Sequence, residues 1–385
     1  MTAPKSWNRD RDPWWLLVDP LLMLSSVAIG VMGVVLVYSA TRGATTDFIP
    51  PDTSFMERQA LFLVAGVGVG VVAALVDVNR LRSLVPAAYG GLILALAAVL
   101  ALGVEVNGAR AWFQFAGFQV QPSEPGKIVV ILALASLFAP LKGEVTTSRL
   151  AAGLVLAGAP ILLILQQPDL GTVLVYLAVL ISIVVVSGVR ARLIALLALL
   201  AVTGTIAVFQ SNVLAQYQEA RLTVFLFDTD EIDAEAEVYA YNAEQAKIAI
   251  GNGGLTGEGL FQGTQTRSEL VPEQQTDFIF TVAGEELGFR GAGLLLAMYS
   301  LLLYRIWRTA QSASSVFGRL LCTGVFAMFL FQVFQAVGMT MGMMPVTGIP
   351  LPLVSYGGSS MLTSMLALGM VAGVHRRRYE VDHRG

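Results

Sequence analysis

A carboxylate at the junction of a polar stretch and an apolar run is the residue best placed to do chemistry in this sequence. Asp277 follows the polar, glycine-rich stretch 251–276 and opens an apolar run of helical length. Thr281, Glu285 and Gly288 follow Asp277 after four, eight and eleven residues, which places all of them on one face of a helix. Asp277 either caps that helix or acts as a catalytic group, and the residues themselves leave both readings open.

Two further ionisable residues open an earlier apolar run. Glu124 and Lys127 stand three residues apart, so they share a helix face and can pair. Ionisable groups at membrane depth are costly and are therefore candidates for a function. The pair either neutralises itself and holds helices together, or Lys127 contacts an anionic headgroup while Glu124 orients it.

Four other charged residues present a similar choice. Arg58 and Arg110 are either interfacial anchors or ligands of an anionic lipid. Asp169, in the stretch QQPDLGT, is either a helix cap or part of a site. Arg221 either offsets an acidic loop or binds a phosphate.

A proline- and glycine-rich stretch near the C-terminus, TGIPLPLVSYGGSS at 347–360, predicts a re-entrant turn that carries Ser355 and Ser359. Irregular backbone at membrane depth is tolerated only where it is buried in protein or lines a cavity. We expect this turn to lie on the same side of the membrane as the charged residues above. Acidic and basic groups on one side suit an amphipathic, anionic lipid substrate.

The elements that position these residues follow from composition. Of the 385 residues, 55% are hydrophobic and 13% are charged, whereas soluble domains carry about 25% charge. Apolar runs of about 20 residues recur along the chain, the length that crosses a bilayer. The sequence therefore predicts an all-α, polytopic membrane protein, a single transmembrane domain over 1–385 with about ten spans. The expected spans are 16–39, 58–76, 84–104, 122–140, 149–165, 170–188, 191–209, 277–303, 316–337 and 358–374.

Lysine and arginine are concentrated in alternate connections, which predicts that these connections and both termini are cytoplasmic. The segment 210–276 is then a large extracytoplasmic loop, with eleven acidic and three basic residues in 211–276. Within it, 239–250 reads as an amphipathic helix and the acidic stretch 228–237 as solvated chain. We expect 375–385 to be a basic cytoplasmic tail.

Cysteine and histidine usage excludes some chemistry. Cys322 is the single cysteine, so no disulfide framework can form. His375 and His383 are the only histidines, and we place both in the C-terminal tail. A histidine base or a histidine-ligated metal in the body of the protein is therefore not expected, and no dedicated cluster of metal ligands is evident.

Five stretches together resemble the SEDS family (shape, elongation, division and sporulation proteins), bacterial membrane glycosyltransferases that polymerise lipid II into peptidoglycan. The stretches are NGARAWFQFAGFQVQPSEPGKI, QQPDLGT, IAIGNGGLTGEGLFQGTQT, VPEQQTDFIFTVAGEELGF and TGIPLPLVSYGGSS, and they span nearly the whole chain. PEQQTDFIF and TGIPLP are more similar to the elongation branch, RodA, than to the division branch, FtsW.

The resemblance implies ten transmembrane helices and a catalytic role for Asp277 as general base. It implies positive charge for the substrate pyrophosphate, for which Arg58, Arg110, Lys127 and Arg221 are the candidates, with Glu124 orienting Lys127. A divalent cation, magnesium or manganese, is a plausible cofactor. The expected partner is a class B penicillin-binding protein, a transpeptidase, in the bacterial cytoplasmic membrane, and no nucleic acid is expected.

Two departures and two alternatives accompany this resemblance. Ala336 occupies a position where members of the family often carry asparagine, and the acidic insert 228–237 is unusual. A lipid II flippase would use the same charged groups as a transit path through the bilayer. A scaffold without chemistry would recruit the transpeptidase and would not need Asp277.

Overall fold

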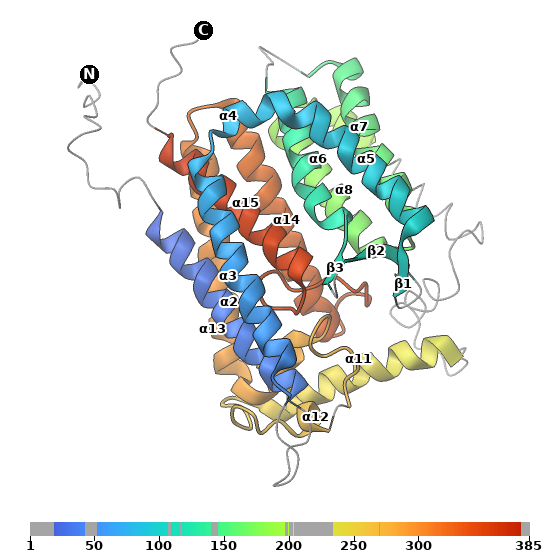
Figure 1. Ribbon diagram of the computed structural model, residues 1–385, viewed down its shortest axis with the longest axis vertical. Coiled ribbons are helices and arrows are strands. Elements are labelled where there is room, and N and C mark those ends of the chain that lie inside the picture. Colours follow the sequence, from blue (N-terminus) through green and yellow to red (C-terminus); the bar gives the residue numbers. More distant parts are fainter. Residues whose placement is uncertain are drawn as a thin grey trace, which may run out of the picture.

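The computed structural model describes residues 19–42, 52–106, 109–115, 118–139, 145–196, 199, 203, 234–268 and 270–378 as a bundle of long helices (Figure 1). The helices that run the length of the bundle are α2 (Pro20–Thr41), α3 (Ser54–Leu75), α5 (Val85–Leu102), α6 (Ser123–Phe138), α7 (Thr147–Leu165), α8 (Leu170–Val186), α13 (Ile279–Ser312), α14 (Val316–Thr340) and α15 (Gly358–Arg376). The remaining elements are α4 (Val78–Leu81), η1 (Arg82–Leu84), α11 (Ala234–Gly253), α12 (Thr264–Arg267), β1 (Val104–Val106), β2 (Ala109–Phe115) and β3 (Phe118–Val120).

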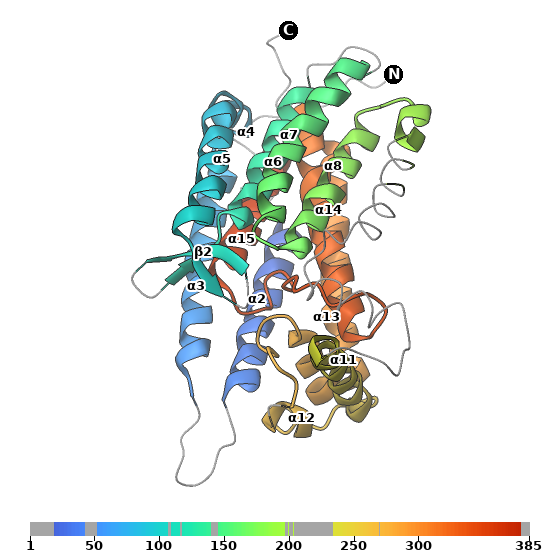
Figure 2. The same ribbon diagram turned by 90° about the vertical axis from the view of Figure 1, so that its right-hand side faces the viewer.

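The long helices confirm the predicted class. Seven described segments are long and apolar enough to cross a membrane, and α8 is a shorter apolar helix of 17 residues. Each of the long helices overlies one of the predicted spans. The remaining predicted span, 191–209, falls mostly outside the described residues. The elements on either side of it, α8 and α11, lead to opposite ends of the bundle, as a span between them requires (Figures 1 and 2).

We name the two ends of the bundle by their buried or half-buried aspartates. At the Asp19 end, α2 begins while α13 and α15 end, and Asp19 contacts both Arg305 and His375. At the Asp277 end lie the small sheet, α11 and α12 (Figure 2). The start of α2 and the end of α15 are therefore on the same side of the bundle.

Glycines set a close contact between α3 and α15. A side chain at Gly369 of α15 would overlap the backbone of Gly70 of α3, and one at Gly70 would lie 3.0 Å from the backbone oxygen of Met365. In lipid, where the hydrophobic effect does not drive helices together, such close backbone contact supplies the packing energy. This contact fixes α3, which opens near the predicted site, against α15.

The connection between α5 and α6 forms a three-stranded antiparallel sheet that we did not predict. In the sheet order β1-β2-β3, Glu105 pairs with Arg110 and Phe115 with Phe118. The dipeptide Asn107-Gly108 between β1 and β2 is a strong hairpin signal. The sequence thus contained a hairpin signal. We did not predict the sheet because its strands of 3, 7 and 3 residues are much shorter than the apolar runs on either side.

Three predicted boundaries need correction. Helix α13 continues to Ser312, beyond the predicted end at residue 303, and it is kinked at Gly288, where φ is 64°. Helix α15 extends to Arg376 and buries His375, so the tail predicted at 375–385 begins later and one histidine belongs to the bundle. Helix α11 confirms the helix predicted at 239–250 and also includes residues 234–237, which we assigned to solvated chain.

Candidate functional site

Asp277 lies in a tight turn immediately before α13. The carbonyl oxygen of Glu273 accepts hydrogen bonds from the backbone N–H groups of Thr276 and Asp277, both at 3.1 Å. Glu273 itself has φ of 51°, an uncommon value for a residue with a side chain. The N-cap position of α13 is occupied by Phe278 and not by Asp277. Asp277 thus lies one residue before the N-cap position, and its catalytic role stays a prediction.

The carboxylate of Asp277 faces a glycine in the turn before α15. A Cβ atom placed on Gly348 would lie 3.3 Å from Oδ2 of Asp277, and Gly348 has φ of 70°. Glycine therefore serves twice here, because it accepts this backbone conformation and leaves room beside the carboxylate. Asp277 is half-buried, so it remains accessible from outside the bundle.

The turn that carries Asp277 is fixed to two other parts of the chain. Ser355 donates its hydroxyl to the carbonyl of Thr276 (2.5 Å), and the backbone N–H of Tyr356 donates to the carbonyl of Gln275 (2.9 Å). The side chain of Gln274 donates to the carbonyl of Ala40 at the end of α2 (2.8 Å). The position of Asp277 is thus set by contacts of the three preceding residues with the turn before α15 and with the end of α2.

Residues 351–355 confirm the predicted buried turn, since all five are buried. Leu353 has φ of 69°, a conformation that costs about 1–3 kcal/mol in a non-glycine residue and persists only where its surroundings hold it. The hydroxyl of Tyr299 donates to the carbonyl of Pro352, and Gly33 of α2 lies directly against the backbone of Leu353 and Val354. Helices α2 and α13 therefore hold a strained turn in place.

Asp169 and Ser359 meet through Gln121, which precedes α6. The side chain of Gln121 donates to Oδ2 of Asp169 (2.9 Å), and its backbone N–H donates to the hydroxyl of Ser359 (3.2 Å). Asp169 also caps α8, accepting from the backbone N–H of Thr172 (2.9 Å) and from its hydroxyl (2.7 Å). The cap reading of Asp169 is confirmed, and the same carboxylate joins α6 and α8 at the Asp277 end.

Glu124 and Lys127 form the predicted pair in the first turns of α6. Nζ of Lys127 lies 2.7 Å from Oε1 of Glu124, and the side chains of Lys127 and Glu124 are only 3% and 5% exposed. Tyr176 of α8 donates its hydroxyl to the carbonyl of Ser123 beside them (2.9 Å). The pair is therefore enclosed and mutually neutralised in this structure, and contact between Lys127 and a substrate stays a prediction.

The two carboxylates that follow Asp277 on α13 hold loops and do not extend a reactive face. Glu285 is fully buried and accepts from the backbone N–H groups of Gln265 (2.6 Å) and Thr266 (3.0 Å), and it thereby caps the short helix α12. Glu286 accepts from the hydroxyl of Ser39 on α2 (2.6 Å). Glu285 is too deep to cap α13 and instead caps the separate helix α12, whereas Glu286 joins α13 to α2. The spacing of the two residues could not reveal these partners.

The predicted arginines are less tightly held. Arg110 on β2 lies 3.6 Å from Glu105 on β1, and both side chains are more than half exposed. Arg58 is exposed at the start of α3. Hydrogen bonds from Ser54 and, to a smaller extent, the charge of Arg58 lower the pKa of nearby Asp52. Arg221 lies outside the described residues.

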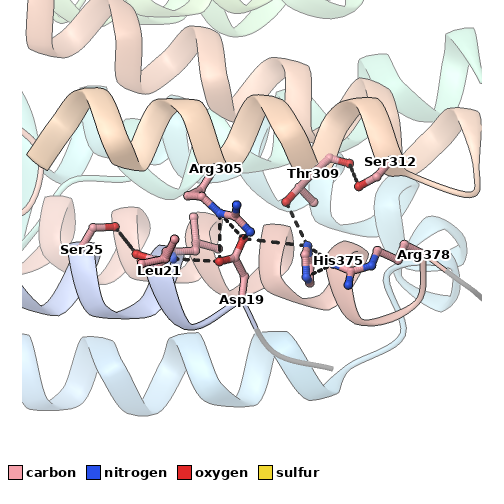
Figure 3. Close-up of polar contacts among 9 residues, drawn as sticks. Asp19, Leu21, Ser25, Arg305, Thr309, Ser312, His375 and Arg378 are labelled. Carbon is pink, nitrogen blue, oxygen red and sulfur yellow. Dashed lines mark hydrogen bonds and ion pairs between the residues drawn. The ribbon is translucent and has the colours of Figure 1, made fainter. Parts of the chain in front are cut away.

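A second polar cluster, at the Asp19 end, was not predicted (Figure 3). Asp19 accepts from Nε of Arg305 at 2.8 and 3.0 Å and caps α2 through the N–H of Leu22 at 3.1 Å. His375 lies 3.9 Å from Asp19, and Arg378 contacts the His375 ring. Asp19 before Pro20 is a recognisable helix-start signal, but its partner Arg305 is 286 residues away.

The chain matches the sequence profile of the FtsW/RodA/SpoVE family of cell cycle proteins over residues 19–380. The chain belongs to this family. It is 34% identical over 374 residues to the peptidoglycan glycosyltransferase MrdB of Escherichia coli (strain K12), with 96% of this chain and 97% of the relative covered. It is 33% identical over 366 residues to the stage V sporulation protein E of Bacillus subtilis (strain 168), with 93% and 97% covered.

Solved structures of the FtsW/RodA/SpoVE family share the fold. The chain matches one described as structural coordination of polymerization and crosslinking by a peptidoglycan synthase complex, with a TM-score of 0.78, 33% identity, and 95% of this chain and 100% of that chain covered. It matches the Rod shape determining protein RodA of Thermus thermophilus with a TM-score of 0.69, 31% identity, and 96% and 100% covered. The protein is therefore an integral membrane protein of the predicted family.

Proposed function

We propose that this protein is a peptidoglycan glycosyltransferase that polymerises lipid II into β-1,4 glycan strands for cell elongation and shape. The observation that carries the proposal is the half-buried carboxylate of Asp277, held beside Gly348 in a turn fixed by Ser355 and Tyr356. Relatives that match nearly the whole chain are named peptidoglycan glycosyltransferases, and they support the same reaction.

In the proposed reaction, Asp277 acts as a general base. It removes the proton from the 4-hydroxyl of the acceptor sugar as that oxygen attacks the anomeric carbon of the donor. The bond from the anomeric carbon to the pyrophosphate breaks, polyprenyl pyrophosphate leaves, and the configuration inverts. A base must be both fixed and reachable, and Asp277 meets both conditions.

The leaving pyrophosphate requires positive charge. We propose that Arg58, Arg110, Lys127 and Arg221 supply it, with Glu124, Asp169, Ser355 and Ser359 shaping the surrounding site. Arg58 is exposed and Arg110 meets Glu105 in a solvent-exposed pair, whereas Lys127 must first exchange its enclosed contact with Glu124. We therefore assign the first phosphate contact to the arginines.

A divalent cation fits this site only as part of the substrate complex. Among the described residues, no group of three or more histidine, cysteine, aspartate or glutamate side chains can hold a metal ion. Magnesium or manganese would therefore bind chiefly through the pyrophosphate oxygens, where it would neutralise charge on the leaving group.

We place the Asp277 end outside the bacterial cytoplasmic membrane and both termini in the cytoplasm. Positively charged side chains gather at the Asp19 end, as cytoplasmic ends require. They lie in α4, in η1, in the last turns of α13 and at the end of α15, and they include Arg80, Arg82, Arg305, Arg308, Arg376 and Arg377. We also propose that the partner is a class B penicillin-binding protein. A matched structure is described as a complex that coordinates polymerization and crosslinking, which supports such a partner.

The test is polymerisation of lipid II by the purified protein together with its transpeptidase, comparing the wild type with Asp277→Asn. Asparagine keeps the size of the side chain but cannot accept the proton. We expect the wild type to form polymer and the variant to lose about 10²–10⁴-fold in rate, the usual contribution of a general base. Binding of the transpeptidase by the variant serves as the control for folding.

Each other outcome points to a different function. Unchanged polymer from a folded Asp277→Asn complex would remove Asp277 from catalysis. Transport of lipid II across vesicle membranes without any polymer would favour a flippase. A wild type that makes no polymer and moves no lipid, but binds its partner, would favour a scaffold.

A further inference from the structure

A buried glutamine on α3 is connected to the turn that carries Asp277. The side chain of Gln59 is fully buried, donates through Nε2 to the carbonyl of Ser355 (3.1 Å), and accepts at Oε1 from the N–H of Gly357 (3.3 Å). Glutamine is suited to this position because its amide both donates and accepts. One side chain thus binds the backbone on both sides of Tyr356.

From there the connection to Asp277 is short. The hydroxyl of Ser355 binds the carbonyl of Thr276, and the N–H of Tyr356 binds the carbonyl of Gln275. Thr276 and Gln275 directly precede Asp277 in the sequence. Any displacement of the backbone at Ser355 is therefore passed to Asp277 through two hydrogen bonds.

We propose that Gln59 is a positioning residue for the reaction, holding Asp277 in place through the turn at residues 355–357. The inference rests on the proposed role of Asp277 as general base. The turn needs such support because Leu353, two residues earlier, has an unfavourable backbone conformation. Rigid side chains that hold a strained turn keep a catalytic group in its productive geometry.

The aromatic residues around Gln59 support this reading. Tyr356 packs edge-on against Phe55 of α3, with ring centroids 5.0 Å apart, and Phe62 of α3 lies 6.3 Å from the same ring. Gln59 lies between Phe55 and Phe62 on α3. The same helix therefore contacts both the backbone of the turn, through Gln59, and the ring of Tyr356, through the two phenylalanines. The start of α3 thus contacts the turn through Phe55 and Gln59, in addition to carrying Arg58, the proposed phosphate ligand.

The experiment compares Gln59→Leu with the wild type in the complex with its transpeptidase, measuring kcat and KM for lipid II polymerisation. Leucine fills much of the space but forms neither hydrogen bond. We expect kcat to fall about 10- to 100-fold, the range in which small misplacements of catalytic groups act. We expect KM to stay within two-fold, because Gln59 is not proposed to touch substrate.

Tyr89→Phe provides the matched control. Its hydroxyl donates to the carbonyl of Leu156 (2.8 Å) and joins α5 to α7, away from the turn. We expect this variant to keep the wild-type kcat. A folded Gln59→Leu complex with wild-type kcat, or equal losses of kcat in Gln59→Leu and Tyr89→Phe, would overturn the positioning role.

A double-mutant cycle keeps the proposal testable if Gln59→Leu does not fold. Gln59→Met then replaces it, since methionine has nearly the length of glutamine but forms neither hydrogen bond. Combined with Ser355→Ala, the second substitution should add less than two-fold to the loss of kcat, because both act through one connection. Losses that multiply would show independent roles and overturn the proposal.

Asp277→Asn in the same assay separates the two claims. If Asp277→Asn is inactive and Gln59→Leu is fully active, the proposed base stands and only the positioning role fails. If Asp277→Asn is active, the proposed base itself fails.

Discussion

At the Asp19 end of the bundle, charged side chains bind one another, whereas at the Asp277 end the buried side chains of Gln59, Gln274 and Ser355 bind backbone carbonyls. Asp19 is enclosed and contacts Arg305 and His375, which ties α2, α13 and α15 together. Gln59 and Ser355, by contrast, hold backbone groups around a half-buried carboxylate. The two ends thus differ: the charges of Asp19 and Arg305 join helices, whereas Asp277 lies in a fixed turn and stays half-buried.

The Asp277 end also contains a charge pair of the first kind. Glu124 and Lys127 are as enclosed as Asp19, although they lie at the end where the reaction is proposed. Burial of a carboxylate is therefore not by itself a sign of catalysis in this protein. What distinguishes Asp277 is that its turn is fixed by neighbours while its side chain stays accessible.

The largest expected loss of stability comes from a substitution in the cluster of Asp19, Arg305 and His375. Arg305→Met leaves the buried carboxylate of Asp19 without its main partner, which should cost about 3–5 kcal/mol of folding free energy. Thermal unfolding of the detergent-solubilised complex measures the loss. The double variant Asp19→Leu with Arg305→Met should recover part of it, because no charge then remains buried. A single variant as stable as the wild type would contradict a structural role for this cluster.

A smaller effect tests the space beside Asp277. In Gly348→Ala, the new Cβ atom lies 3.3 Å from the carboxylate and the backbone keeps an unfavourable φ. We expect polymerisation to fall about 10- to 100-fold, because the carboxylate or the turn must move. Gly68→Ala on α3 is the control, since an added Cβ atom there meets nothing within 4 Å. Equal rates for both variants would show that Asp277 needs no such space.

The smallest effect on stability concerns the exposed pair on the sheet. Arg110→Gln removes a contact with Glu105 in which both side chains are more than half exposed, so stability should change by less than about 1 kcal/mol. If Arg110 binds pyrophosphate, KM for lipid II should rise and its salt dependence should weaken. A drop in unfolding temperature with unchanged KM would return Arg110 to a structural role.

The sequence predicted the helices well because span length and hydropathy are local properties. It also predicted the Glu124–Lys127 pair, which is set by helix geometry over three residues. It could not predict that Glu285 caps α12 or that Asp19 binds Arg305, because these partners come from distant parts of the chain. The sequence likewise could not show that Gln59 faces Ser355 and Gly357, which lie 296 and 298 residues away.

The site was predicted in part. Asp277, Asp169, Ser355 and Ser359 all lie at one end of the bundle, as the alternation of charged connections indicated. The residues that connect them are Gln121, Thr276 and Gln59. We did not predict these three because they are uncharged, and charged residues stand out most in an apolar sequence. His375 was misplaced because it adjoins three arginines that resemble a solvated tail.

The most direct test measures polymerisation rate and unfolding temperature on the same complexes for Asp277→Asn and Arg305→Met. We expect opposite results from the two variants. Asp277→Asn should lose its rate and keep its unfolding temperature, whereas Arg305→Met should lose stability and keep its rate at a temperature where it is folded. Wild-type polymerisation by Asp277→Asn, or parallel losses of rate and stability in both variants, would contradict a catalytic role for Asp277 that is separate from folding.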